Sequence, residues 1–294
     1  MALLDGKLIS ADLKKKIAEK ADLFFKENNR KPHLAALLIG NDPASEVYVE
    51  SKIRSCAEVG FTSTLVRYNS DISEDSVIQL IHEWNQNPEI DGILVQVPLP
   101  KHIDEEKITD TISPAKDVDG FHPNNLGRMM KNLPSFISAT PLGILKLLEA
   151  YSIPTQGKHC VVLGRSSNVG SPISILMGRS GYPGNCTVTL CHSKTENLEG
   201  ILKEADILIA AIGKPEFVHG DQLKPGVVII DVGINRIPDL SKKSGNRLVG
   251  DVHFESAQEV ASYISPVPGG VGLMTIVGLL ENTLLAAQKT IYTK

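Results

Sequence analysis

The stretch "KHCVVLGRSSNVGSPISILMGRSG", residues 158–181, decides the predicted fold. It reads as a buried apolar strand, a turn from Gly164 to Gly170, and a helix. A helix that opens directly after such a turn presents free N–H groups to an anion such as a phosphate. The glycine spacing is wider than the usual G-x-G-x-x-G, so a tight turn without a ligand is the alternative.

Strand and helix patterns alternate on both sides of this turn. After it, apolar strands are predicted at 187–194, 207–213 and 226–235, with a helix at 198–206. Before it, a helix at 140–151 is predicted to link two domains. This alternation predicts a doubly wound α/β unit of the dinucleotide-binding kind.

The first half of the chain shows a second strand–helix alternation. Strands are predicted at 34–40, 62–69 and 91–100, and helices at 8–29, at 44–56 and at 74–87. Ser10 is the predicted cap of the first helix, and Asp42 followed by Pro43 predicts the start of the second. Residues 113–132 are rich in turn formers and are predicted to be irregular. The last apolar stretch, 273–289, is predicted to be a packing helix.

Composition sets limits on the function. The 294 residues fit roughly two domains, and a net charge of −4 without a long basic run does not indicate a nucleic-acid surface. The four cysteines show no C-x-x-C metal spacing, and we interpret them as reduced thiols of a cytoplasmic protein. The N-terminus does not resemble a signal peptide, and the apolar runs are too short to cross a membrane.

The end of the strand at 187–194 indicates which dinucleotide would bind. NAD-binding folds usually place an acid there to hold the ribose 2′-hydroxyl, but here the first acid is Glu196. Arg165 in the glycine turn and Ser193 at the strand end suit a 2′-phosphate instead, which favours NADP. The alternative is that Arg165 and Lys194 are solvated surface charges.

The predicted helix at 44–56 carries the candidate chemistry. Lys52 follows Tyr48 by four residues, so both side chains leave the helix on the same side. Val49, Ile53 and Cys56 form the neighbouring apolar stripe, which we expect to face the core. A lysine acts as a general base only in its neutral form, and a solvated, charged lysine is the plainer interpretation.

Three further polar residues interrupt apolar or turn segments. Gln96 lies inside the predicted strand at 91–100, where its amide needs a hydrogen-bond partner. It is either a functional group or an edge-strand residue bonded to backbone. Asp117 and Asp119, in "KDVDG", are either turn caps or, for one of them, an acceptor for a polar heterocycle.

Six motifs in this order and spacing carry a resemblance over essentially the whole chain. They are "YVESK" after "NDPAS", "ILVQVPLP", "PAKDVDGFHP", "VVLGRSSNVGSP", "VTLCHSKT" and "SPVPGGVGLMT". Together they resemble the bifunctional methylenetetrahydrofolate dehydrogenase/methenyltetrahydrofolate cyclohydrolase family. The resemblance implies a catalytic α/β domain, 1–138 completed by a C-terminal helix at 272–294. It also implies a Rossmann-like NADP-binding domain at 139–271, with a cleft between the domains.

The resemblance implies a reaction and roles on the folate side. The enzyme would oxidise 5,10-methylenetetrahydrofolate with NADP⁺ and hydrolyse the methenyl product to 10-formyltetrahydrofolate. Lys52 would be the catalytic lysine, and Gln96 would bond to it and tune its protonation. Tyr48 would align the folate with Ser45 nearby, and Asp119 would hold the pterin ring. The loop that contains Pro268, Gly269 and Gly272 would line the folate side.

The resemblance also implies the cofactor side and the assembly. Arg165 and Ser193 would take the 2′-phosphate; the remaining cofactor-binding positions would be Gly164, Ser166, Val169, Ile234 and Thr275. The protein would be a homodimer. The chain departs from the family's usual pattern at Ala139, where a Cys is common, and at Leu273, where a Pro is common. The second change is expected to affect the start of the last helix and the position of Thr275.

Three competing hypotheses stay open at this point. One is a dehydrogenase of the same family with little hydrolase activity, which retention of Lys52 and Gln96 disfavours. Another is an NADP-dependent dehydrogenase of a small carbon acid, which would not bind folate. The third is a dinucleotide sensor that binds NADP without turnover.

Overall fold

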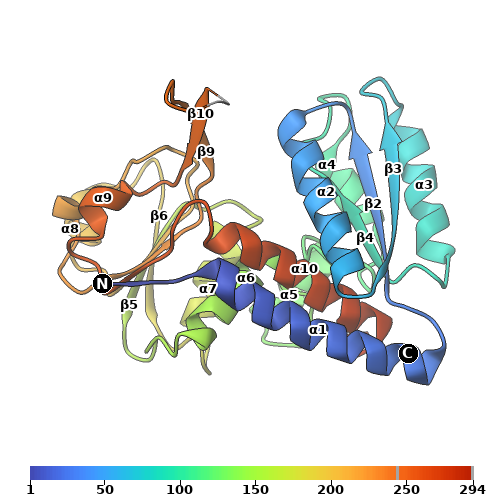
Figure 1. Ribbon diagram of the computed structural model, residues 1–294, viewed down its shortest axis with the longest axis horizontal. Helices are drawn as coiled ribbons and strands as arrows, with labels where there is room; N and C mark the ends of the chain where they lie inside the picture. The colour runs from blue at the N-terminus through green and yellow to red at the C-terminus, as the bar shows by residue number, and fades with distance from the viewer. Residues whose placement is uncertain (243–244, 293–294) are drawn as a thin grey trace. The chain divides into compact units, whose positions relative to one another are not determined.

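The chain forms two α/β units, each built around its own parallel sheet (Figure 1). The structure is a computed structural model that describes residues 1–242 and 245–292. The six-stranded unit contains residues 1–11 and the described part of 140–275, and the three-stranded unit contains residues 12–139 and those described from 276 onward. The α/β organisation predicted from the alternating patterns is therefore confirmed.

The six-stranded unit has the strand order β1-β11-β8-β7-β5-β6, and every pair is parallel. Its strands are β1 (Ala2–Leu3), β5 (His159–Leu163), β6 (Thr187–Cys191), β7 (Ile207–Ala210), β8 (Val228–Asp231) and β11 (Tyr263–Ile264). Strands β5, β7 and β8 are apolar and buried along nearly their full length, as expected for a parallel sheet covered on both faces.

Short helices and one hairpin complete this unit. The elements are α6 (Ala139–Ala150), α7 (Gly170–Gly178), α8 (Leu198–Leu202), η1 (Gly220–Gln222), α9 (Phe254–Ala257) and the antiparallel hairpin of β9 (Asn235–Pro238) and β10 (Asn246–Val249). One core cluster joins Leu208 and Ile229 of the sheet to Leu202 and Ala257 of the helices. This packing holds β5, β7 and β8 in place. The glycine turn follows the carboxyl end of β5.

The three-stranded unit has the order β3-β2-β4, again parallel. Its elements are β2 (His33–Ile39), β3 (Thr62–Tyr68), β4 (Gly92–Val95), α2 (Pro43–Glu58), α3 (Glu74–Gln86), α4 (Glu105–Thr111) and α5 (Pro123–Met130), with parts of α1 (Gly6–Asn28) and α10 (Val271–Ala287).

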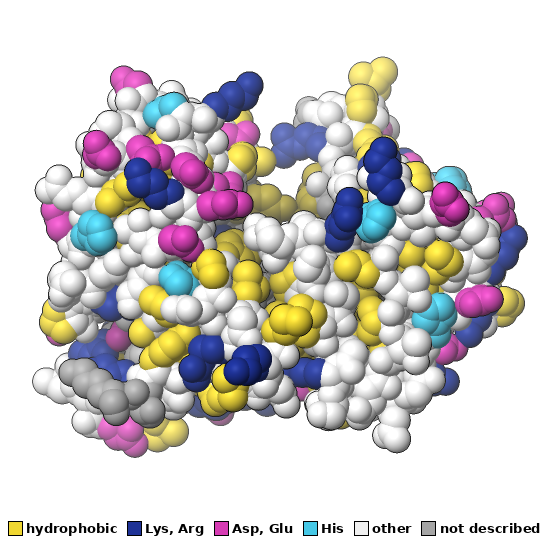
Figure 2. All heavy atoms as spheres, turned by 180° about the vertical axis from the view of Figure 1, so that it is seen from behind, with side chains coloured by type: hydrophobic (Ala, Val, Ile, Leu, Met, Phe, Trp, Pro, Cys, Tyr) yellow, Lys and Arg dark blue, Asp and Glu magenta, His cyan; other side chains and the backbone are white. Residues whose placement is uncertain are grey.

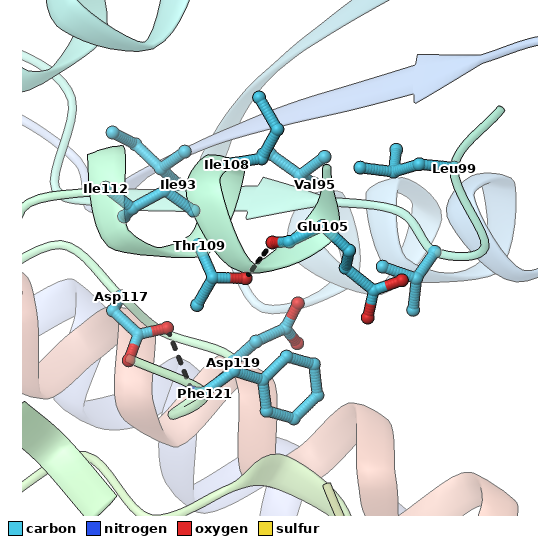
Figure 3. A pocket seen from close by; sticks show the side chains of 11 residues that line it. Ile93, Val95, Leu99, Glu105, Ile108, Thr109, Ile112, Asp117, Asp119 and Phe121 are labelled. Carbon is cyan, nitrogen blue, oxygen red and sulfur yellow. Dashed lines mark hydrogen bonds between the residues drawn. The ribbon is translucent and has the colours of Figure 1, made fainter. Parts of the chain in front are cut away.

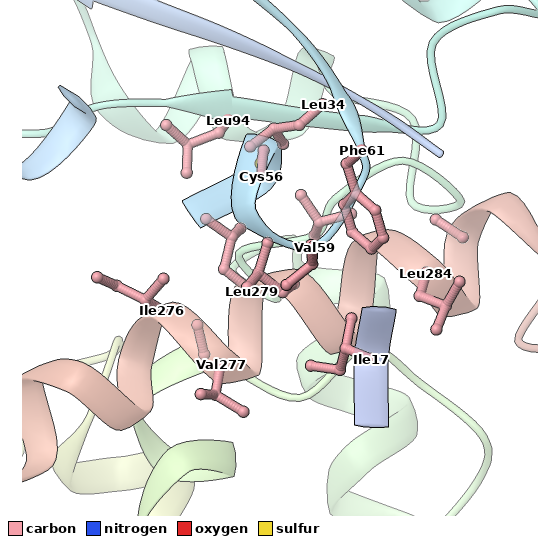
Figure 4. Close-up of a cluster of buried hydrophobic side chains, with 14 of the residues drawn as sticks. Ile17, Leu34, Cys56, Val59, Phe61, Leu94, Ile276, Val277, Leu279 and Leu284 are labelled. Atoms are coloured by element: carbon pink, nitrogen blue, oxygen red, sulfur yellow. The ribbon is translucent and has the colours of Figure 1, made fainter. Parts of the chain in front are cut away.

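Successive residues of β2 bury themselves on opposite faces of this sheet. Leu34 and Ala36 belong to the cluster that contains Leu279 of α10 and Ile17 of α1 (Figure 4). Ala35 and Leu37 belong to the cluster that contains residues of α3 and α4. A strand covered on both faces needs an unbroken apolar sequence, which explains "HLAALLI".

The structure corrects three sequence predictions. The first helix begins at Gly6 because Asp5 caps it through the Leu8 N–H (3.0 Å), so Ser10 is not the cap. The predicted irregular segment 113–132 contains α5, whose start is made by His122 accepting from the Asn124 N–H. Strand β4 ends at Val95, so the predicted strand at 91–100 is too long and Gln96 lies just beyond it.

The unit boundaries differ slightly from the predicted domains. Residues 1–11 lie with the six-stranded unit because β1 pairs with β11 at the edge of its sheet. The last helix begins at Val271, two residues before Leu273, and the change to Leu therefore falls inside the helix. Among the described residues, no helix is both long enough and apolar enough to cross a membrane.

Candidate active site

Helix α2 places Tyr48 and Lys52 on one side of the three-stranded unit. It starts where predicted, since the Asp42 carboxylate accepts from the Ser45 N–H at 2.8 Å and Pro43 opens the first turn. Val49 and Cys56 are fully buried, which confirms that the apolar stripe faces the core. Lys52 is half-buried beside this stripe, Ser45 is buried, and Tyr48 keeps 40% of its surface exposed.

Lys52 donates a hydrogen bond of 3.1 Å to Oε1 of Gln96. The Gln96 amide cannot turn freely, because its Nε2 donates to the carbonyl oxygen of Val97 at 2.6 Å. That second bond directs the amide oxygen at the lysine. Gln96 is therefore bonded to backbone just beyond the strand, and it also pairs with Lys52, as the resemblance implied.

The "KDVDG" turn separates its two acids. Asp117 is 2% exposed and accepts from the N–H groups of Gly120, Phe121 and His122 and from Nδ2 of Asn125, so it is a turn cap. Asp119 makes no side-chain hydrogen bond to any described residue. Burial raises the pKa of the Asp119 carboxyl group, and the nearby Lys52 charge opposes that rise.

Asp119 lines a pocket of the three-stranded unit (Figure 3). The walls come from the end of β4, from α4 and from the turn at 117–121; they include Val97, Leu99, Thr109 and Phe121. The wall is mostly apolar, and the carboxylates of Glu105 and Asp119 line it without a hydrogen bond to the described part of the chain. A carboxylate in this state can accept hydrogen bonds from a polar ligand. The wall residues Leu99 and Phe121 were missed by sequence reasoning, because neither carries a chemical signal of its own.

The glycine turn of the six-stranded unit requires glycine at both ends. Gly164 has φ +117°, and a Cβ there would lie 2.1 Å from the Ala211 oxygen. A Cβ on Gly170 would lie 2.0 Å from the Gly164 oxygen. Helix α7 then opens at Gly170 with Val169 before it, and Ser166 Oγ accepts from the Gly170 N–H at 3.3 Å. The turn thus lies close against a helix N-terminus that can receive a phosphate.

Arg165 and Ser193 lie just beyond the carboxyl ends of two neighbouring strands, β5 and β6. Leu163 and Cys191, the last residues of β5 and β6, are paired in register, and each candidate follows two residues later. Both side chains are exposed. The guanidinium of Arg165 and the hydroxyl of Ser193 therefore follow adjacent strand ends, with no acid beside them before Glu196, and both are groups that can donate hydrogen bonds to a phosphate.

The remaining candidates gather around the start of α10 in the six-stranded unit. Ile234 is 44% exposed, and its Cδ1 would lie 3.2 Å from a Cβ on Gly272. Thr275 Oγ1 lies 3.0 Å from Thr140 Oγ1. The loop of Pro268 and Gly269 is held by the Lys7 N–H, which donates to the Gly269 oxygen at 3.1 Å.

Other parts of the surface and core add limits. On the face drawn in Figure 2, basic side chains are interspersed with acidic ones. The four cysteines are free and buried, and Ala139, where the family often has Cys, is also buried. Within residues 1–242 and 245–292, no cluster of His, Cys, Asp or Glu is suited to a metal ion.

Two family models match the chain. The model described as the tetrahydrofolate dehydrogenase/cyclohydrolase catalytic domain matches residues 4–119. The model described as the NAD(P)-binding domain of the same family matches residues 138–291. Together they cover most of the sequence.

Full-length relatives and solved structures are similar to the chain. The bifunctional protein FolD of Porphyromonas gingivalis is 54% identical, over 97% of both chains. The structure of the bifunctional FolD of Campylobacter jejuni is 42% identical with a TM-score of 0.92, covering 99% of both chains. A Trypanosoma brucei FolD structure, complexed with NADP cofactor and an inhibitor, is 32% identical with a TM-score of 0.93, covering 100% of this chain and 99% of that one.

Proposed function

Because the chain belongs to the tetrahydrofolate dehydrogenase/cyclohydrolase family, we propose that the Lys52–Gln96 pair is the centre of its chemistry. The enzyme oxidises 5,10-methylenetetrahydrofolate to 5,10-methenyltetrahydrofolate with NADP⁺, and hydrolyses that product to 10-formyltetrahydrofolate. The observation that carries the proposal is the 3.1 Å bond from a half-buried lysine to an amide oxygen held in place by its own second bond.

On the folate side, each residue receives a role that its position supports. Asp119 accepts hydrogen bonds from the pterin ring, since its carboxylate lines the pocket and bonds to no other described side chain. Tyr48 contacts and aligns the folate one helical turn from Lys52, with buried Ser45 supporting that turn. Pro268, Gly269 and Gly272 contribute backbone close to the substrate.

On the cofactor side, the glycine turn fits NADP. Gly164, Ser166 and Val169 form the approach to the α7 N-terminus, and the turn keeps its shape because a Cβ on Gly164 or Gly170 would overlap a backbone oxygen. Arg165 and Ser193 hold the 2′-phosphate, and Ile234 and Thr275 border the nicotinamide. When bound, NADP⁺ would supply the hydride acceptor, and these residues would bind and orient it.

One lysine can serve both steps. Hydride transfer depends on the one-carbon unit being held in position, which accounts for much of such a rate. Loss of hydride leaves a cation on the folate, and a cation beside an ammonium group favours loss of the ammonium proton. The ammonium proton passes to solvent, and neutral Lys52, oriented by Gln96, then takes a proton from the water whose oxygen bonds to the one-carbon unit. The bond from that carbon to N5 breaks, and N5 takes up a proton, which leaves the formyl group on N10.

Domain roles and assembly complete the proposal. Folate chemistry belongs to residues 1–138 together with the C-terminal segment that holds α10 (Val271–Ala287), and NADP binding to residues 139–271. The protein acts as a homodimer in the cytoplasm. Light scattering coupled to gel filtration tests the assembly: a mass near 31.8 kDa would contradict the dimer, and twice that mass is expected.

A spectroscopic time course tests the function. Purified protein is mixed with 5,10-methylenetetrahydrofolate and NADP⁺, and then with NAD⁺, while reduced cofactor and methenyl product are followed separately. We expect reduced NADP without accumulation of the methenyl compound. Accumulation would indicate a dehydrogenase with a defective hydrolytic step, and absence of turnover would contradict the assignment.

A substitution identifies the residue responsible. Lys52→Ala should lower methenyl hydrolysis by on the order of 100-fold or more, because it removes the general base. Arg54→Ala, an exposed position on the same helix, is the matched control and should retain full activity. Undiminished hydrolysis in Lys52→Ala would exclude the role given to this lysine.

A further inference from the structure

The orientation of Asp119 depends on its backbone. Its carboxylate has no hydrogen-bond partner among the described residues, although it lines the pocket in Figure 3. A side chain that is not itself held takes its direction from the φ and ψ angles and the position of its own peptide groups. The groups that fix residues 118–120 therefore determine where the carboxylate can meet a ligand.

Asn282 of α10 holds the peptide group that leads into Asp119. Its Nδ2 donates to the Val118 oxygen and to the Ile137 oxygen, both at 2.8 Å. Asn282 is 1% exposed and Val118 is fully buried. A buried amide that satisfies two carbonyl groups is costly to remove, because the carbonyls would then lack partners. The same amide ties the turn at 118 to the segment at 137.

Residues 137–139 hydrogen-bond to the turn on the C-terminal side of Asp119. The Ala139 N–H donates to the Asp119 oxygen at 3.2 Å, and Ser138 Oγ donates to the Gly120 oxygen at 3.0 Å. Gly120 has φ +72°, and a Cβ there would lie 2.6 Å from the backbone carbonyl carbon of Ile137. Asn282 thus bonds to both of the closely packed segments beside Asp119, 118–120 and 137–139, which we call the clamp.

The side chains that hold Asp117 differ from the one that holds the peptide group before Asp119. Asn125 donates to Asp117 at 2.8 Å and accepts from the Tyr292 hydroxyl at 2.9 Å. Among the described residues, Asn125 and Tyr292 make no bond to the peptide groups on either side of Asp119, whereas Asp117 Oδ1 accepts from the Gly120 N–H, in the peptide group after Asp119, at 3.1 Å. Of the side chains described between residues 276 and 292, Asn282 is the one bonded to the peptide group between Val118 and Asp119.

We propose that Asn282 is a positioning residue that sets the direction of the Asp119 carboxylate toward the folate ring. This inference rests on the proposed ring-binding role of Asp119. Loss of the Asn282 amide should weaken folate binding through Asp119 and leave NADP binding unchanged. The same loss should change folate binding little in a variant that lacks the Asp119 carboxylate.

A double-mutant cycle tests the proposal. KM for 5,10-methenyltetrahydrofolate hydrolysis is measured for Asn282→Ser, for Asp119→Ala and for the double variant. We expect about a tenfold rise for Asn282→Ser alone, and less than a twofold further rise in the Asp119→Ala background, since a positioning effect acts through its target. KM for NADP⁺ in the dehydrogenase reaction should stay within twofold of the unmodified enzyme for Asn282→Ser.

Two further variants keep the test decisive. Thr283→Val removes a buried hydroxyl whose one bond within the described part of the chain is to the Leu279 carbonyl of the same helix, and it should leave folate KM unchanged. Ser138→Ala removes another bond of the clamp and should act like Asn282→Ser, more weakly, even where Asn282→Ser does not fold. Equal rises with and without Asp119 would overturn the inference. An unchanged KM in Asp119→Ala would instead remove the ring-binding role on which it rests.

Discussion

Strand β2 of the three-stranded unit and strand β5 of the six-stranded unit both begin with a histidine in the same setting. His33 Nε2 lies 2.9 Å from Thr64 Oγ1, and His159 Nε2 lies 2.8 Å from Thr189 Oγ1, each on the next strand. The backbone N–H of His33 donates to the Asp91 carboxylate at 2.9 Å, and the backbone N–H of His159 donates to the Asp206 carboxylate at 2.8 Å.

The same strands also end alike. Gly40 follows β2 and Gly164 follows β5, both with positive φ. Each glycine N–H donates at 2.9 Å to the last residue of the neighbouring strand, Tyr68 or Cys191. The strand orders β3-β2-β4 and β6-β5-β7 correspond as well.

The two regions differ beyond the glycines. After Gly40 the chain enters α2 at Pro43, which carries Tyr48 and Lys52. After Gly164 it makes a longer turn before α7 begins at Gly170. The comparison teaches that the amino ends of the strands hold the fold and the carboxyl ends carry the chemistry, as in other open α/β sheets.

The largest expected contrast lies at the two glycines. Gly164→Ala should cost on the order of 4 kcal/mol or more and abolish NADP binding, because the Cβ would overlap the Ala211 oxygen. Gly40→Ala should cost only about 1–2 kcal/mol, since the nearest atom is 3.7 Å away and only the positive φ is unfavourable. Urea unfolding and NADP titration measure both effects. Equal costs would break the comparison.

The next contrast lies at the two aspartates. Asp91 pairs with Arg30 through two bonds of 2.8 Å and its side chain is 4% exposed, so Asp91→Ala should cost about 3 kcal/mol. Asp206 pairs with Lys224 and its side chain is 29% exposed, so Asp206→Ala should cost about 1 kcal/mol or less. Denaturant midpoints measure the difference. A larger loss for Asp206→Ala would show that burial does not set the order.

A smaller effect separates the two ends of β5. Arg165→Gln, at the carboxyl end, should raise KM for NADP⁺ about tenfold, or roughly 1.4 kcal/mol, with little change for NAD⁺. Lys158→Gln, at the exposed amino end, changes charge equally and should leave both values unchanged. The ratio of kcat/KM for the two cofactors is the measurement. An unchanged ratio in Arg165→Gln would show that Arg165 is a solvated surface charge without a role in cofactor choice.

The smallest expected effect is a pH dependence in the six-stranded unit. The hydrogen bond from Lys224 holds the pKa of Asp206 below its usual value, and the His159 N–H adds to this. A lowered folded-state pKa stabilises the fold above the unfolded pKa of about 3.9, and that stability is lost as pH falls through the folded value. The Tm difference between the unmodified enzyme and Asp206→Asn should therefore be constant above about pH 5 and shrink toward pH 3. A difference that grows on acidification would contradict this origin.

Much of the fold followed from local patterns. The apolar runs of β2, β5 and β7 and the Asp42-Pro43 start of α2 were predictable, because burial and capping depend on neighbouring residues. Strand β1 was not, since two residues have no periodicity and their pairing with β11 joins opposite ends of the chain. Helix α5 was missed because its cap is a histidine, an uncommon one.

The sequence by itself determined which side chains could share a surface along one element. It placed Tyr48 and Lys52 one helical turn apart, and it marked Gly164 and Gly170 as the ends of a turn. Residue spacing did not bring Gln96 to Lys52; the resemblance implied that contact, and the tertiary structure shows it. Only the tertiary structure decided that, of two similar aspartates, Asp117 caps a turn while Asp119 faces a pocket. The physical reason is distance along the chain: helical spacing fixes near neighbours, whereas Val118 and Asn282 meet across 164 residues through packing.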